Sequence, residues 1–195
     1  MRLFICEFMD RIIDYVFVDT SVLMQESYFK STSRIAQLFD LAGKGYIKIL
    51  LPIITKQEWI KHIKESTYIK FDDVKRKLQL LGNLPNVLKF VDDFERLTST
   101  YANIVVDSID TQISNGKVEV IDYSFFSDTL SDVFDKYFKK TKPFGCNGKS
   151  KEFPDAFVLA ALEKYAIKHS IEQIIIFSND KDMIQYDSKI IAVKE

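Results

Sequence analysis

The stretch from residue 15 to residue 21, Tyr-Val-Phe-Val-Asp-Thr-Ser, constrains the fold of this chain more than any other. Its apolar run has the length of a short buried strand, and Asp19 stands at the end of that run. A carboxylate is costly to bury without a partner, so an acid at this point requires an explanation. In an open parallel sheet, ligands bind at the carboxyl ends of the strands. The stretch therefore predicts a buried strand that delivers Asp19 to a ligand-binding edge.

Other strand-like runs alternate with helix-like sequence along the chain. Strands are predicted over residues 46–51, 118–122, 174–178 and 190–193, and helices over 33–42, 55–81, 87–113, 127–138 and 155–168. Residues 20–33 and 139–152 are predicted to be loops, the second because it contains Pro and Gly. Because a strand–helix–strand order favours right-handed parallel crossovers, we predict an α/β fold with a mostly parallel central sheet.

The length of 195 residues fits one domain, residues 1–195, in which about 64–142 is a helical elaboration of the α/β core. The two cysteines, Cys6 and Cys146, fit neither a metal motif nor a disulfide framework. The first apolar run is stopped by Glu7, and no apolar run approaches the roughly 20 residues that span a bilayer. We therefore expect a cytoplasmic protein with no membrane partner.

Carboxylates recur just beyond strands or in the first turn of the helix that follows. These acids are Asp19, Glu58, Asp155, Asp180 and Asp182. In a parallel sheet all such positions face the same edge, so the acids are expected to converge. Mg²⁺ and Mn²⁺ prefer oxygen ligands, and a carboxylate cluster without His or Cys suits a site with one or two such metals acting on phosphodiesters.

Each acid except Asp19 also has a simple local explanation. Thr55 and Glu58 have the Thr-x-x-Glu spacing of a capping box. The helix macrodipole favours an acid such as Asp155 in a first helical turn, and aspartate is a common N-cap residue, as Asp180 would be. The acids therefore carry the functional prediction together rather than singly.

Four segments in combination resemble the PIN-domain nucleases. They are residues 16–23 (Val-Phe-Val-Asp-Thr-Ser-Val-Leu), 54–58 (Ile-Thr-Lys-Gln-Glu), 152–156 (Glu-Phe-Pro-Asp-Ala) and 176–182 (Ile-Phe-Ser-Asn-Asp-Lys-Asp). The resemblance covers both ends of the chain and leaves the middle, about 64–142, unmatched. It implies a three-layer α/β/α sandwich in which the middle of the chain is a helical insertion.

The resemblance also implies an activity, that of a metal-dependent endoribonuclease with Mg²⁺ or Mn²⁺ as cofactor. The catalytic and metal-binding acids would be Asp19, Glu58, Asp155 and Asp180, with Asp182 as an auxiliary metal ligand. Ser21 and Asn179 would be supporting contacts near the metal and the substrate. The substrate would be RNA, single-stranded or structured. A role as a toxin or defence effector, an antitoxin or other protein partner, and a homodimer all stay open.

The charges are distributed unevenly although the formal net charge is only −1. Between residues 136 and 151 there are six lysines and no acid. Lysines bind phosphates and interleaved aromatic residues stack on unpaired bases, so this segment is predicted to present RNA to the acids. Lys149 and Lys151 are the predicted substrate contacts, with a solvated loop as the alternative. His62 and His169 lie in no ligand-like spacing and are expected to have surface or packing roles.

Other folds also place an aspartate at the end of a strand. A phosphatase of the haloacid dehalogenase kind needs a second aspartate two residues later, where this chain has Ser21. A receiver domain needs adjacent acids upstream, which the short first strand does not offer. The alternative that remains lies in a different class, a catalytically degenerate PIN module that binds RNA or a protein partner without cleavage.

Overall fold

The computed structural model describes residues 14–26, 32–80, 85–144 and 150–194. Within these ranges, five strands form one sheet in the order β3-β2-β1-β4-β5, and every neighbouring pair is parallel. The strands are β1 (Asp14–Val18), β2 (Ile47–Pro52), β3 (Val118–Ile121), β4 (Ile174–Phe177) and β5 (Ile191–Lys194). The predicted α/β class with a parallel sheet is confirmed. The central position of β1 places Asp19 at the middle of the carboxyl edge.

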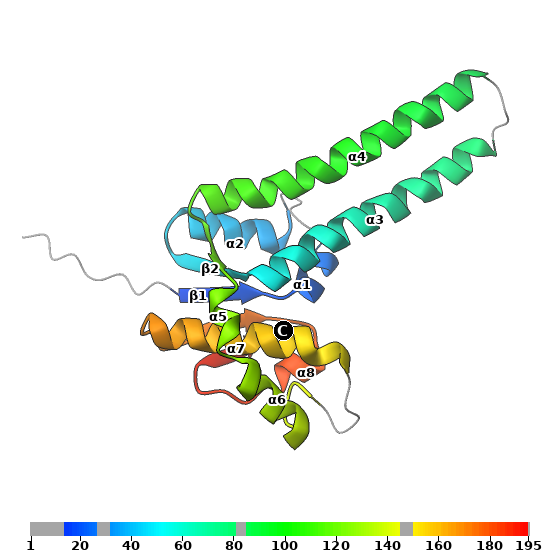
Figure 1. Ribbon diagram of the computed structural model, residues 1–195. Helices are drawn as coiled ribbons and strands as arrows, with labels where there is room; N and C mark the ends of the chain where they lie inside the picture. The colour runs from blue at the N-terminus through cyan, green and yellow to red at the C-terminus, as the bar shows by residue number, and fades with distance from the viewer. Residues whose placement is uncertain (1–13, 27–31, 81–84, 145–149, 195) are drawn as a thin grey trace, which may run out of the picture.

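Helices cover both faces of the sheet, as Figure 1 shows. One face carries α1 (Thr20–Gln25), α2 (Arg34–Gly43) and the first turns of α3 (Ile53–Gln79), together with the last turns of α4 (Pro85–Ser114). The other face carries α5 (Ser124–Ser127), α7 (Phe153–Lys168) and α8 (Lys181–Ile184), and α6 (Leu130–Lys139) packs outside α7. The three-layer α/β/α sandwich is therefore also confirmed.

The alternation of side chains along β1 explains why there are two cores. Val16 and Val18 pack on the α2 side of the sheet, whereas Phe17 packs on the α7 side, as expected for successive residues of a strand. All three side chains are buried. β1 is thus covered on both faces, which is typical of strands in all-parallel sheets and holds the position of Asp19 rigidly.

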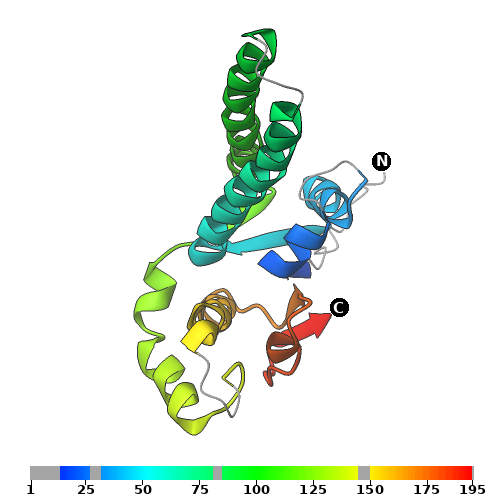
Figure 2. The same cartoon turned by 90° about the vertical axis from the view of Figure 1, so that its right-hand side faces the viewer.

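Helix α7 is buried around much of its circumference. Val158, Leu159 and Leu162 pack toward the sheet, while Ala156 and Ala160 lie in the cluster shared with α6. A helix that is apolar on most sides lies inside a protein rather than on its surface. Its first turn, which carries Asp155, is consequently fixed against the carboxyl edge. Figure 2 shows this end of α7 facing the viewer, in yellow.

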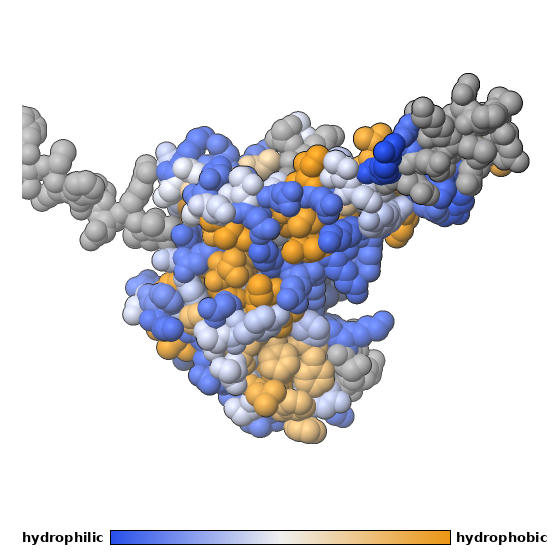
Figure 3. All heavy atoms as spheres, turned by 45° about the horizontal axis from the view of Figure 1, so that its top comes forward, coloured by the Kyte–Doolittle hydropathy of each residue, from blue (hydrophilic) through white to orange (hydrophobic). Residues whose placement is uncertain are grey.

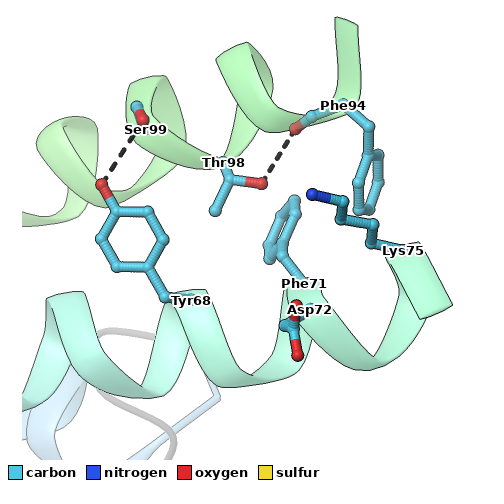
Figure 4. Close-up of a pocket in the computed structure, with 7 residues that line it drawn as sticks. All are labelled: Tyr68, Phe71, Asp72, Lys75, Phe94, Thr98 and Ser99. Carbon is cyan, nitrogen blue, oxygen red and sulfur yellow. Dashed lines mark hydrogen bonds between the residues drawn. The ribbon is translucent and has the colours of Figure 1, made fainter. Parts of the chain in front are cut away.

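Helices α3 and α4 form a hairpin that extends well beyond the sheet (Figures 1 and 2). Between them lies a cavity of about 280 Å³, toward which Tyr68, Phe71 and Phe94 point (Figure 4). The rings of Phe71 and Phe94 are 4.9 Å apart. Tyr68 follows Glu58 by ten residues, or roughly 15 Å of helix, so this cavity is separate from the acids. Hydrophobic residues form several separate patches on the side drawn in Figure 3.

Two local predictions are wrong, and one predicted helix begins later than expected. Residues 20–25, predicted as a loop, form α1, because the Asp19 carboxylate accepts a hydrogen bond from the backbone N–H of Ser21 and caps the helix. The helix predicted over 127–138 is α6, which begins at Leu130 after buried Thr129 donates its hydroxyl to the carbonyl of Phe126. The strand predicted over 118–122 is present as β3.

The second wrong prediction is the capping box. α3 begins at Ile53, before Thr55, and its N-cap is Pro52, which makes no side-chain capping bond. The Thr-x-x-Glu spacing therefore lies inside the helix, with Thr55 buried. Glu58 is free of the capping role and needs another explanation. Among the described helices, none has the length and apolar character to cross a membrane.

Candidate metal centre

Asp19 occupies the end of β1 and is 8% exposed. Its backbone N–H donates to the carbonyl of Phe177 at 2.9 Å, which ties it to the end of β4. Its Oδ2 accepts hydrogen bonds from the hydroxyl of Ser178, at 3.0 Å, and from the hydroxyl of Ser21. Because donors from two elements hold the same oxygen, the carboxylate has one fixed orientation at the edge of the sheet.

The two serines extend this arrangement to the β4–α8 connection. The backbone N–H of Asn179 donates to the Ser21 hydroxyl at 3.1 Å, and the N–H of Asp180 donates to the Ser178 hydroxyl at 3.0 Å. Asp180 is itself the N-cap of α8 and accepts from the N–H of Asp182 at 2.6 Å. The predicted N-cap role of Asp180 is thus present, and Ser178 links the backbone of Asp180 to the Asp19 carboxylate.

Glu58 lies on the second turn of α3 and contacts the start of α1. Its Oε2 accepts from the Thr20 hydroxyl at 3.2 Å. Burial raises the pKa of Glu58 above its ordinary value and the charge of Asp19 adds to that effect, while the Thr20 hydrogen bond opposes it. The second acid of the predicted set therefore lies within electrostatic range of the first.

Asp155 stands at the centre of the acids. Burial and, in decreasing order, the charges of Asp19, Glu58, Asp180 and Glu152 together raise its pKa from 3.8 to about 7. One carboxylate oxygen from each of Glu152, Asp155 and Asp180 lies within 4.8 Å of the others. Such crowding of negative charge is unfavourable without a cation, so the local electrostatics fit a divalent ion at this point.

Asp182 is not among the three acids whose carboxylate oxygens lie within 4.8 Å of one another. Its Oδ1 accepts from the ammonium of Lys142 at 2.5 Å, across 40 residues of sequence. Both side chains are partly exposed, at 32% for Lys142 and 20% for Asp182. Asp182, predicted as an auxiliary metal ligand, thus forms an ion pair with Lys142 of the predicted basic segment.

The predicted substrate contacts lie in different surroundings. Ser21 and Asn179 belong to the hydrogen-bond network of Asp19, and Lys151 is exposed in the 3₁₀ turn η1 (Ser150–Glu152) directly before α7. Lys149 lies outside the described residues, as do Cys6 and Cys146.

His169 caps the end of α7 and stacks on Tyr165 with ring centroids 4.2 Å apart, a packing contact.

Glu152 is the acid that sequence reasoning missed. It precedes Asp155 by three residues and is 8% exposed. Residues three apart face the same side of a helical turn, and this spacing was the available signal. The predicted loop over 139–152 included Glu152, whereas the turn η1 and the helix beginning at Phe153 bring it beside Asp155.

A family model described as the PIN domain matches residues 16–183. The chain belongs to the PIN-domain family. PIN domains are generally nucleases and usually use divalent metals, and the acidic cluster of this member lies at the carboxyl edge of its sheet. No curated protein and no solved structure matches the chain.

Proposed function

We propose that this PIN-domain protein is an endoribonuclease that hydrolyses RNA with a carboxylate-bound Mg²⁺ or Mn²⁺. The observation that carries the proposal is the convergence of Glu152, Asp155 and Asp180, whose carboxylate oxygens lie within 4.8 Å of one another. Asp19 and Glu58 contribute their charge to the same point. Acids from four separate parts of the chain meet here, and packing of the fold alone does not require that.

The residues present fit a hard divalent cation. All the donors are carboxylate oxygens, which suit Mg²⁺ and Mn²⁺ rather than a metal that prefers nitrogen or sulfur. Glu152, Asp155 and Asp180 would hold the cation, and Asp19 and Glu58 would complete the negative field around it. When bound, such an ion polarises a phosphoryl oxygen and lowers the pKa of water.

The protein's own groups have positioning roles in this proposal. Ser21 and Ser178 fix the Asp19 carboxylate, and the N-terminus of α8 fixes Asp180. These hydrogen bonds hold the acids in place before any ligand arrives, which lowers the reorganisation that binding requires. At the rim, Lys142 and Lys151 supply positive charge for the phosphates of a bound strand, in a site otherwise dominated by acids.

The proposal is tested with purified protein, a single-stranded RNA and a DNA of the same sequence. Internal cleavage of the RNA is expected with Mg²⁺ or Mn²⁺ and is expected to stop with chelator and in Asp19→Asn. The exposed acid Asp107 gives a matched control, because Asp107→Asn changes the charge equally outside the cluster. Cleavage that persists in Asp19→Asn would refute the site, and preference for the DNA would refute the substrate.

Two outcomes of the same experiment bear on the biological role. RNA binding without cleavage, with or without metal, would replace the nuclease by a degenerate binding module. Growth inhibition on expression, relieved by Asp19→Asn but not by Asp107→Asn, would support a toxin or defence effector. Expression without any growth defect would argue against that role while leaving the nuclease proposal to the cleavage assay.

A further inference from the structure

An apolar cavity of about 250 Å³ opens beside the acids, on the α2 side of the sheet. Its walls come from the first two helices and from the end of β4, far along the chain. They are Val22 of α1, Leu38 and Leu41 of α2, and Phe177 at the end of β4. Val22, Leu38 and Phe177 are only partly buried, so their apolar surface continues from the core into the cavity.

The polar residues that line this cavity, Arg34, Gln37 and Asn179, are all exposed. Asn179 donates its side-chain N–H to the side-chain amide oxygen of Gln25 at 2.7 Å, which fixes the orientation of its amide. Arg34 is 67% exposed and is held by an ion pair of 2.6 Å with Glu26. The cavity therefore combines an apolar interior with a fixed amide and a fixed guanidinium at its opening.

The cavity and the metal centre share their supporting residues. Val22 follows Ser21, whose hydroxyl contacts Asp19, and Asn179 precedes Asp180 of the acid cluster. The backbone N–H of Asn179 donates to the same Ser21 hydroxyl at 3.1 Å. A chain bound with a phosphate at the acids would thus have its neighbouring group beside the opening of the cavity.

We propose that this cavity binds one unpaired nucleobase of the RNA, next to the phosphate that is held at the acids. Unpaired bases bind proteins by stacking on aromatic rings and by hydrogen bonds along their edges. Phe177 supplies the ring, Asn179 the donor and acceptor for an edge, and Arg34 a cation for the adjacent phosphate. The cavity would therefore set the nucleotide preference beside the cleaved bond. This inference rests on the proposed function for its substrate class.

The test uses the four nucleoside 5′-monophosphates, and ribose 5-phosphate as a probe that lacks the base, in calorimetric titrations with Mg²⁺. Leu41→Trp and Leu38→Trp fill the cavity from two positions, and Leu41, at 38% exposed, tolerates a larger side chain without disturbing the core. Leu97→Trp places the same residue on an exposed part of α4 as the matched control. Thermal unfolding checks that each variant is folded.

The expected result is a preference of the unaltered protein for at least one nucleotide. Filling the cavity should weaken its binding about ten- to hundredfold, the usual contribution of a stacked base. Binding of ribose 5-phosphate, and every affinity of Leu97→Trp, should stay unchanged. Absence of saturable nucleotide binding, unchanged affinity in both filled variants, or an equal loss for ribose 5-phosphate would each overturn the proposal.

These titrations separate the inference from the nuclease proposal. Selective loss of nucleotide binding in a protein that cleaves no RNA would support the base-binding cavity and refute the nuclease. Metal-dependent cleavage whose nucleotide preference is the same in Leu41→Trp as in the unaltered protein would support the nuclease and refute the base-binding cavity.

Discussion

Asp155→Asn is expected to stabilise the metal-free protein, and the gain should grow between pH 5 and pH 8. In the folded chain, burial and the charges of four neighbouring acids raise the pKa of Asp155 from 3.8 to about 7. The folded state therefore binds more protons than the unfolded state between about pH 4 and pH 7. Stability falls as the pH rises through that range, because ionised Asp155 is unfavourable only in the folded protein. Asparagine removes the charge at nearly constant size.

The magnitude follows from the two pKa values. At about 1.4 kcal/mol per pKa unit, the difference between 3.8 and about 7 corresponds to at most about 4 kcal/mol of unfolding free energy. About 1.7 kcal/mol of this is already lost at pH 5, and about 2.6 kcal/mol more is lost by pH 8. The unfolding free energy of Asp155→Asn should therefore exceed that of the unaltered protein by this additional amount at pH 8 compared with pH 5.

Urea unfolding with chelator present, at pH 5 and pH 8, measures this advantage. Asp107→Asn serves as the control, because Asp107 is exposed on α4. Its free energy of unfolding should follow that of the unaltered protein at both pH values. An advantage of Asp155→Asn that is equal at the two pH values, or a variant less stable than the parent at pH 8, would refute the electrostatic account of the cluster.

Two further substitutions test other parts of the site. Glu152→Gln should weaken Mg²⁺ binding about tenfold or more, because one carboxylate is lost from the cluster. The measurement is the Mg²⁺ concentration that produces half of the thermal stabilisation. If that concentration is the same in the variant, Glu152 does not belong to the site. Ser178→Ala should lower the unfolding free energy by about 1–3 kcal/mol in urea, because buried Ser178 bonds both Asp19 and the N–H of Asp180. An unaltered free energy would show that these hydrogen bonds add no net stability.

The positions of Asp19, Asp155 and Asp180 could be anticipated because they depend on short-range rules. Each follows a strand or opens a helix, and a parallel sheet brings such positions to one edge. The apolar runs at residues 16–18 and 174–177 are equally local signals, so the α/β class could also be predicted from the sequence.

Other features depend on where a helix starts, which periodicity does not determine. The Thr55–Glu58 spacing suggested a cap, but α3 begins at Ile53 and Glu58 accepts a hydrogen bond from Thr20 of α1. The turn that precedes α7 likewise brings Glu152 beside Asp155. The ion pair of Lys142 with Asp182 spans 40 residues and requires the packed fold. A local pattern gives no distance between such residues.

Binding of Mn²⁺ to the purified protein tests the central claim most directly. Equilibrium dialysis at pH 8 is expected to show saturable binding that is lost in Asp155→Asn and retained in Asp107→Asn, because only Asp155 lies within the cluster of carboxylate oxygens. Saturable Mn²⁺ binding that survives in Asp155→Asn, or its absence from the unaltered protein, would contradict the assignment of these acids as a metal centre.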